Sequence, residues 1–171
     1  MAIVILNAMD RRKKEVITIG KILDERLIVL GADVHSAEEC ILLMAALFEK
    51  YGYVKPGYGD AVVERERNLP TGLPGKKINI AIPHTNNEFV IKPAVGVIIP
   101  REPVEFKMMG MKDKTLSCEI ILPLVVKDSK HQIGMLKKMM NIIQDGELLQ
   151  SIKESKSSVD VMNCLRTLDE Q

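Results

Sequence analysis

A histidine stands directly after a proline at the end of a short apolar run, Ile78-Asn79-Ile80-Ala81-Ile82-Pro83-His84. The run predicts a strand, and Pro83 ends it because proline cannot donate to a strand ladder. His84 is therefore expected on a proline-braced turn with its ring facing solvent, a place where loops commonly carry function. A neutral imidazole held there could act as a nucleophile. A histidine that only satisfies a loop entrance would fit the same position.

The other two histidines lie at the starts of predicted helices. His131 falls in the first turn of its helix, where unpaired backbone amides and the helix dipole favour an anion such as phosphate. An ordinary solvated polar residue would suit that turn equally well. His35 precedes a helix cap at Ser36, and nothing near it in the sequence supplies chemistry, so we interpret it as structural or exposed.

Composition limits the kinds of protein this chain can be. Its 171 residues, 46% of them hydrophobic, suffice for one domain with one substantial core. The 24 basic and 23 acidic residues give a formal charge of +1, which does not favour a nucleic-acid partner. The longest apolar stretch, 120–126, is far shorter than the roughly 20 residues of a membrane-spanning helix. We expect no membrane insertion.

The cysteines and the start of the chain indicate a compartment. Cys40, Cys118 and Cys164 are odd in number and have no close pair, as reduced, buried thiols would. No cleavable leader pattern opens the sequence, since Met1–Leu6 leads directly into charged residues. The sequence predicts a soluble, cytoplasmic protein.

Helices and strands alternate along the first half of the chain. Residues 27–30, followed by Gly31, predict a strand, and the Ser36/Glu39 pair is typical of a capping box. The helix that follows should end near Gly52. A second helix is expected after Pro56, ending before Pro70.

Further strands are expected at 94–99 and 118–126, the second broken by Pro123, with a short edge strand at 104–106 and a mobile turn at 108–114. A helix capped by Asp128 or Ser129 should follow, then helices near 147–152 and 159–168. The residues expected to share the buried face of the first of these helices are Ile133, Leu136, Met140 and Ile143. Together these elements predict an α/β fold, a single mixed β-sheet flanked by helices on both faces in an α/β sandwich.

Two blocks taken together carry a family resemblance. Residues 65–73, Arg-Glu-Arg-Asn-Leu-Pro-Thr-Gly-Leu, and 80–85, Ile-Ala-Ile-Pro-His-Thr, resemble the signature of the fructose/mannitol-type enzyme IIA domains of the phosphoenolpyruvate-dependent sugar phosphotransferase system. The resemblance extends from about 23 to 168, and the Leu-Pro-Thr-Gly-Leu approach looks most like galactitol-type enzyme IIA. A type 2 enzyme IIA domain is therefore expected over 21–171, with 1–20 as an N-terminal extension.

The resemblance implies a reaction and roles for five residues. His84 would accept a phosphoryl group on Nε2 from phospho-HPr and pass it to a cysteine of enzyme IIB, which serves the membrane enzyme IIC. Arg65 matches an arginine near the active histidine, and its guanidinium suits phosphate oxygens unless it only pairs with a neighbouring glutamate. His131 matches a second active-site histidine, while Thr71 and Thr85 could orient the ring or a phosphate oxygen. Neither cofactor nor metal is implied.

Partners and alternatives follow from the same residues. Cys118 lacks the basic or glycine-rich setting of a phosphate-accepting thiolate, so enzymes IIB and IIC are expected to be separate chains. Because two partners must dock in turn, an apolar rim is expected, with Met108, Met109 and Met111 as contributors. One alternative is a regulatory module in which phosphorylation of His84 signals to a protein target. Another is a metal site made by His84, His131 and Cys40.

Overall fold

The computed structural model describes residues 22–127 and 129–168. The strands are β1 (Leu23–Ala32), β2 (Gly72–Leu73), β3 (Asn79–Ala81), β4 (Ala94–Pro100), β5 (Val104–Met108), β6 (Met111–Ile121) and β7 (Leu124–Val125). The helices are α2 (Ala37–Lys50), α3 (Tyr58–Asn68), α4 (Ser129–Gln144), α5 (Gly146–Glu154) and α6 (Ser158–Leu165), with 3-10 turns at Asn87–Phe89 and Arg166–Leu168. The expected extension at 1–20 lies outside the described residues.

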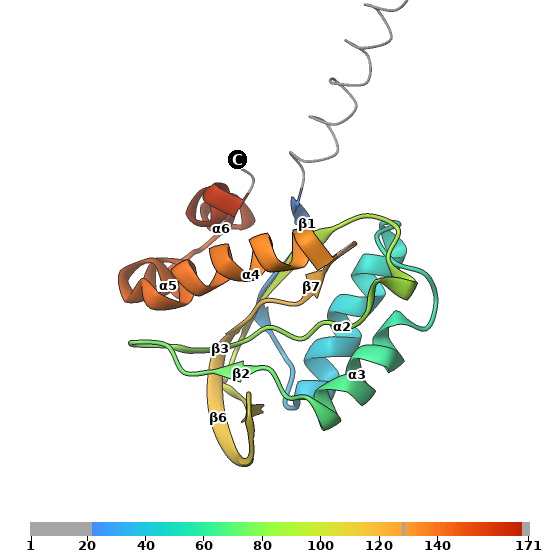
Figure 1. Cartoon of the computed structure of the whole chain (residues 1–171). Coiled ribbons are helices and arrows are strands. Elements are labelled where there is room, and N and C mark those ends of the chain that lie inside the picture. The colour runs from blue at the N-terminus through green and yellow to red at the C-terminus, as the bar shows by residue number, and fades with distance from the viewer. Residues whose placement is uncertain (1–21, 128, 169–171) are drawn as a thin grey trace, which may run out of the picture.

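The strands form one mixed sheet in the order β1-β4-β6-β3-β2-β5, with β7 paired to β4 (Figure 1). β1 runs parallel to β4, and β3 runs parallel to β6, whereas β4 and β6 are antiparallel. β5 also pairs with β6, so β2, β3, β5 and β6 form a closed circuit of pairings. The sequence prediction of a single mixed sheet is confirmed.

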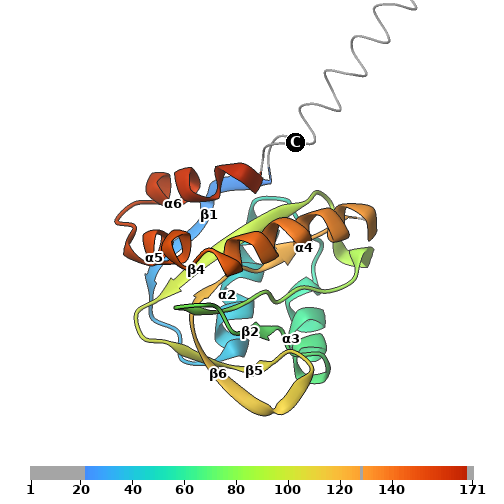
Figure 2. The same ribbon diagram turned by 60° about the vertical axis from the view of Figure 1, so that its left-hand side comes forward.

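Helices cover both faces of this sheet, as predicted. α2 and α3 enclose one buried cluster, in which Met44, Phe48 and Val62 pack against sheet residues such as Ile98. α4, α5 and α6 cover the opposite face, as two views of the chain show (Figures 1 and 2). Each face therefore has its own apolar core, and β4, which lies between β1 and β6 in the sheet, is buried along its whole length.

Local capping explains where the first two described helices begin and end. Ser36 Oγ accepts a hydrogen bond from the Glu39 amide at 3.1 Å, and α2 gives way at Gly52, whose φ of 78° suits glycine. α3 follows Pro56 and ends at Asn68, just before Pro70. Both predicted helices are confirmed, and Arg65 does lie in the last turn of α3.

Two expectations about local structure are wrong. The segment expected as a turn over 108–114 is mostly strand, because Gly110 adopts a φ of 75° and lets β5 turn directly into β6. On α4, Ile133 and Met140 of the expected face are exposed and Leu136 is half-buried, whereas Ile143 is buried as expected, together with Met135, Met139 and Ile142. The buried stripe is thus rotated from the predicted one. The break at Pro123 between β6 and β7 is confirmed.

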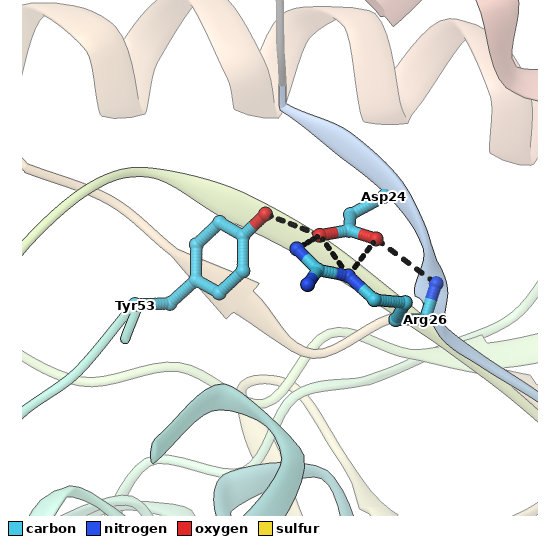
Figure 3. Close-up of polar contacts among 3 residues, drawn as sticks. All are labelled: Asp24, Arg26 and Tyr53. Carbon is cyan, nitrogen blue, oxygen red and sulfur yellow. Dashed lines mark hydrogen bonds and ion pairs between the residues drawn. The ribbon is translucent and has the colours of Figure 1, made fainter. Parts of the chain in front are cut away.

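A polar cluster ties the start of β1 to the loop between α2 and α3 (Figure 3). The Asp24 carboxylate accepts hydrogen bonds from Arg26 Nε at 2.9 Å and from the Tyr53 hydroxyl at 2.6 Å. The guanidinium holds the pKa of Asp24 well below its usual range, while burial and the adjacent carboxylate raise the pKa of Tyr53 to about 12. The cluster thus links β1 to a segment 29 residues away.

None of the helices in the described part of the chain is both long enough and apolar enough to cross a bilayer. Cys40, Cys118 and Cys164 are free thiols, the first two buried and the third half-buried. Burial raises the pKa of both buried thiols to about 12, which keeps them protonated and unreactive at neutral pH.

Candidate functional site

A cleft of about 560 Å³ opens where α3 ends, beside the turn that carries His84. Its walls come from the end of α3 and the loop after it, from the tip of the β5–β6 hairpin, and from α4. The residues that line it are Arg65, Asn68, Leu69, Pro70, Thr71, His84, Met109, Gly110, Lys112 and Leu136. Segments separated by up to 71 residues in the chain therefore meet at this histidine.

His84 is buried, with 5% of its surface exposed, so the expectation that its ring faces solvent is wrong. Its Nδ1 lies 2.6 Å from the carbonyl oxygen of Ile82, two residues back in the chain. This hydrogen bond holds the ring against the end of its own strand instead of projecting it outward. The carbonyl can only accept, so Nδ1 carries the proton and the lone pair belongs to Nε2.

The surroundings of His84 favour the neutral ring. Burial lowers the pKa of the imidazole below its usual value, and the positive charge of Arg65 lowers it further, whereas the hydrogen bond to Ile82 acts in the opposite direction. The ring therefore keeps the Nε2 lone pair at neutral pH. A nitrogen in this state can attack an electrophile.

Arg65 reaches the same cleft from the last turn of α3. Its Nη1 lies 3.4 Å from the carbonyl oxygen of His84, and the guanidinium lines the cleft. The exposed Lys112, on β6 just past the hairpin tip, lines it as well. Two cations thus border the space beside a neutral imidazole, an arrangement that suits an anionic group such as phosphate.

Thr71 lines the cleft but is itself 1% exposed. Its amide and its hydroxyl each donate a 2.8 Å hydrogen bond to the carboxylate of Glu66. Glu66 is also buried, and burial raises its pKa, although the two bonds from Thr71 and the charge of Arg65 lower it. From the sequence, Glu66 was expected only as one of two neighbouring glutamates, with Glu64, that could pair with Arg65. Its spacing four residues after the apolar Val62 could have placed it on the buried side of α3.

The remaining expected site residues are less closely gathered. Thr85 is half-buried and is not among the residues found to line the cleft. His131 lies in the first turn of α4, as predicted, but its side chain is outside the described part of the structure. α4 does border the cleft through Leu136. The alternative metal site depended on His131, and no metal-binding cluster of His, Cys, Asp or Glu occurs among the described side chains.

Comparison with known proteins identifies the fold that builds this cleft. A family profile described as "Phosphoenolpyruvate-dependent sugar phosphotransferase system, EIIA 2" matches residues 21–167. The chain belongs to this family. As an EIIA 2 domain it is a phosphoryl carrier, a component of a phosphotransferase, and the resemblance drawn from the two sequence blocks is confirmed.

Curated relatives of this EIIA 2 domain include components of mannitol-specific and of galactitol-specific phosphotransferase systems. A mannitol-specific EIICBA component of Vibrio cholerae is 29% identical over 150 residues, which cover 85% of this chain but 22% of that protein. The chain therefore spans about a fifth of the length of that relative. A mannitol-specific enzyme IIA component of Halalkalibacterium halodurans is 26% identical and is covered over 97% of its length. A galactitol-specific EIIA component of Escherichia coli K12 is 23% identical over 59% of this chain.

Solved structures agree on the architecture. The nitrogen regulatory protein IIA-Ntr of Neisseria meningitidis superposes with a TM-score of 0.72 at 25% identity, covering 86% of this EIIA 2 chain and 98% of that one. The Escherichia coli enzyme IIA for mannitol, in its complex with phosphorylated enzyme IIB, gives a TM-score of 0.69 at 24% identity, covering 85% of this chain and 97% of that one. The second likeness shows the fold alone.

Proposed function

We propose that His84 accepts a phosphoryl group from phospho-HPr and passes it to a cysteine of a cognate enzyme IIB, which serves a membrane enzyme IIC during sugar uptake. In the first transfer the P–N bond of the donor breaks as a bond forms between phosphorus and Nε2 of His84. In the second, that bond breaks as a P–S bond forms on the acceptor. The chain would act as a relay in the cytoplasm and needs no cofactor.

One observation carries this proposal. The 2.6 Å hydrogen bond from Nδ1 to the Ile82 carbonyl leaves the Nε2 lone pair on a neutral ring that lines the cleft. Phosphoryl transfer requires little else from a protein than an aligned nucleophile and fixed charges around the transferred oxygens. Arg65 and Lys112 supply positive charge there. His131, Thr71 and Thr85 remain candidates for contacts with the ring or the phosphoryl group.

The border of the cleft suits docking by two proteins in turn. Leu69 and Met109 line it and are 59% and 41% exposed, and Met111 follows on the same hairpin. Methionine adapts to surfaces of different shape, which favours successive partners. Among solved relatives, the mannitol enzyme IIA of Escherichia coli is known in complex with phosphorylated enzyme IIB. A IIB partner at the corresponding cleft is the simplest reading of that likeness.

For the sugar we propose a hexitol system. The Leu69–Leu73 approach favours the galactitol type, and galactitol-specific relatives match over 59% of the chain. Mannitol-specific relatives match over a larger share, up to 87%. Uptake assays with labelled galactitol and mannitol, in cells lacking and then regaining this chain, would separate the two.

The phosphorylation itself can be tested directly. The protein is incubated with phosphoenolpyruvate, enzyme I and HPr, and the acid-labile phosphate is located by mass spectrometry. We expect one phosphoryl group on His84, no label in His84→Ala, and full label in the exposed-histidine control His35→Ala. Label that survives in His84→Ala would refute the proposal.

A regulatory role is the second candidate, favoured by the likeness to the Neisseria meningitidis nitrogen regulatory protein. Such a module would still be phosphorylated on His84 but would not pass the group to enzyme IIB. Transfer from the phosphorylated protein to purified galactitol-type or mannitol-type IIB therefore discriminates. Transfer within seconds supports uptake, and a phosphoprotein that persists beside both IIB proteins supports regulation.

A further inference from the structure

We propose that Glu66 is a positioning residue that sets the orientation and tautomer of His84 through a buried chain of hydrogen bonds. The inference rests on the proposed function of His84 as the phosphoryl acceptor. The hydrogen bonds that the structure gives the Glu66 side chain go to Thr71, so Glu66 would act on the His84 ring through other residues. Its side chain is buried, and taking a carboxylate out of water is unfavourable unless its oxygens are well bonded, so its hydrogen-bond partners are the place to look for its role.

The chain of bonds begins at the carboxylate. Glu66 Oε1 accepts from the Thr71 amide and Oε2 from the Thr71 hydroxyl, each at 2.8 Å. Two donors on two oxygens fix both the backbone and the side chain of Thr71. Thr71 is thereby held against α3, whose Val62 and Val63 pack in the core.

The next links run from Thr71 to the histidine ring. The Thr71 carbonyl oxygen accepts from the Ile82 amide at 3.3 Å, and the Ile82 carbonyl oxygen accepts from His84 Nδ1 at 2.6 Å. Ile82 is thus held on one side by Thr71 while it holds the ring on the other. Displacing Thr71 would loosen the acceptor that keeps the proton on Nδ1 and the lone pair on Nε2.

A second hydrogen bond connects the residue after Thr71 to the hairpin that forms another wall of the cleft. The Gly72 carbonyl oxygen accepts from the Met109 amide at 2.8 Å, at the tip of the β5–β6 hairpin. A Cβ at Gly72 would lie 2.6 Å from the Lys107 carbonyl oxygen, so the two backbones approach as closely as glycine permits. By fixing Thr71, Glu66 therefore helps to position both the His84 ring and the hairpin that carries Lys112.

Glu66→Gln tests this inference, since the amide keeps the shape of the side chain but offers only one acceptor oxygen. We expect phosphorylation of His84 by phospho-HPr to slow by about 10- to 100-fold, by analogy with the losses that follow removal of the residues that hydrogen-bond to metal-binding histidines and carboxylates. In ¹⁵N NMR of the unphosphorylated protein, the fraction of the Nδ1–H tautomer should fall. The matched control is Glu64→Gln, an exposed glutamate on the same helix, which should change neither quantity.

Thr71 variants keep the test decisive if Glu66→Gln does not fold. Thr71→Val removes the hydroxyl donor and should shift the tautomer and slow the reaction, whereas Thr71→Ser should restore both. Wild-type rate and tautomer in Glu66→Gln would overturn the inference, as would slow transfer with an unchanged tautomer. Because the NMR measurement needs no phosphate donor, it judges the positioning role even if His84 proves not to be the acceptor.

Discussion

The chemistry of His84 depends on opposing effects of its surroundings. Burial and the charge of Arg65 lower the pKa of the imidazole, while the bond from Nδ1 to Ile82 raises it. A more exposed ring would take up a proton more readily and lose its nucleophilic lone pair. A ring buried without the Ile82 acceptor would have no fixed tautomer. Burial against the end of its own strand keeps the ring neutral, and the bond to Ile82 fixes the tautomer.

Arg65 provides the first test at this scale. Arg65→Ala should slow phosphorylation of His84 by roughly 10²-fold, because it removes a fixed cation where charge must be stabilised during transfer. The unfolding free energy should stay close to that of the wild type, since the guanidinium lies at the cleft and not in the core. Rapid-quench measurements with phospho-HPr give the rate, and urea unfolding gives the stability.

Arg67→Ala is the matched control for that variant. Arg67 lies two residues further along α3, is exposed, and pairs at 2.8 Å with Glu38, away from the lining of the cleft. An exposed ion pair contributes about 1 kcal/mol or less to stability. Equal transfer rates in Arg65→Ala and Arg67→Ala would mean that the Arg65 guanidinium does not contribute to phosphoryl transfer.

At the level of elements, capping and chain-breaking residues were the most informative part of the sequence. Ser36, Gly52 and Pro70 act through local backbone chemistry, so α2 and α3 could be bounded without knowledge of the rest of the fold. The break at Pro123 follows from the same kind of reasoning. These local signals were sufficient to place Arg65 near the end of a helix and His84 just beyond a strand.

Other elements depend on tertiary contacts that no local pattern reports. On α4, Met139 and Met140 are identical residues at adjacent positions, yet Met139 is fully buried and Met140 is 41% exposed. Only the position of the sheet selects between them. Likewise, the burial of His84 and the bond between Glu66 and Thr71 depend on how the loop after α3 packs on β3. Sequence motifs therefore indicated His84 as the candidate acceptor but did not indicate the buried residues around it.

The contact between α2 and β4 gives a prediction at this scale. A Cβ at Gly96 would lie 2.6 Å from the sulfur of Met44, which is fully buried. Gly96→Ala should therefore reduce the unfolding free energy by about 1 to 3 kcal/mol, the usual result of overpacking a core. Chemical denaturation of the variant and the wild type measures the difference.

The double variant Gly96→Ala/Met44→Ala identifies the cause. Met44→Ala alone should cost about 2 to 5 kcal/mol through the cavity it leaves. If the clash is the cause, the two losses should sum to more than the loss in the double variant, because the new methyl group then has room. Strictly additive losses would assign the effect of Gly96→Ala to something other than Met44.

The candidate cleft lies where both layers of helices meet the sheet. α3 contributes Arg65 from one layer, and α4 contributes Leu136 from the other. The hairpin between β5 and β6 forms the third wall. Since all three are anchored in the two cores, the cleft depends on the integrity of the whole fold, and a change in protonation at the cleft should be measurable as a change in global stability.

The pH dependence of stability follows from the sign of that coupling. The pKa of His84 is lower in the folded protein than its ordinary value of 6.5, so below that pH the unfolded chain binds a proton that the folded one does not. The unfolding free energy should therefore decrease as the pH falls from 7 toward 5. Glu66, whose pKa burial raises above its ordinary value, acts in the opposite direction over the pH range just above that ordinary value. Comparing the wild type with His84→Gln isolates the histidine, since Glu66 and Asp24 are common to both. Urea unfolding at several pH values should show a shallower decrease in His84→Gln than in the wild type. Parallel curves for the two proteins would mean that folding does not disfavour the charged ring.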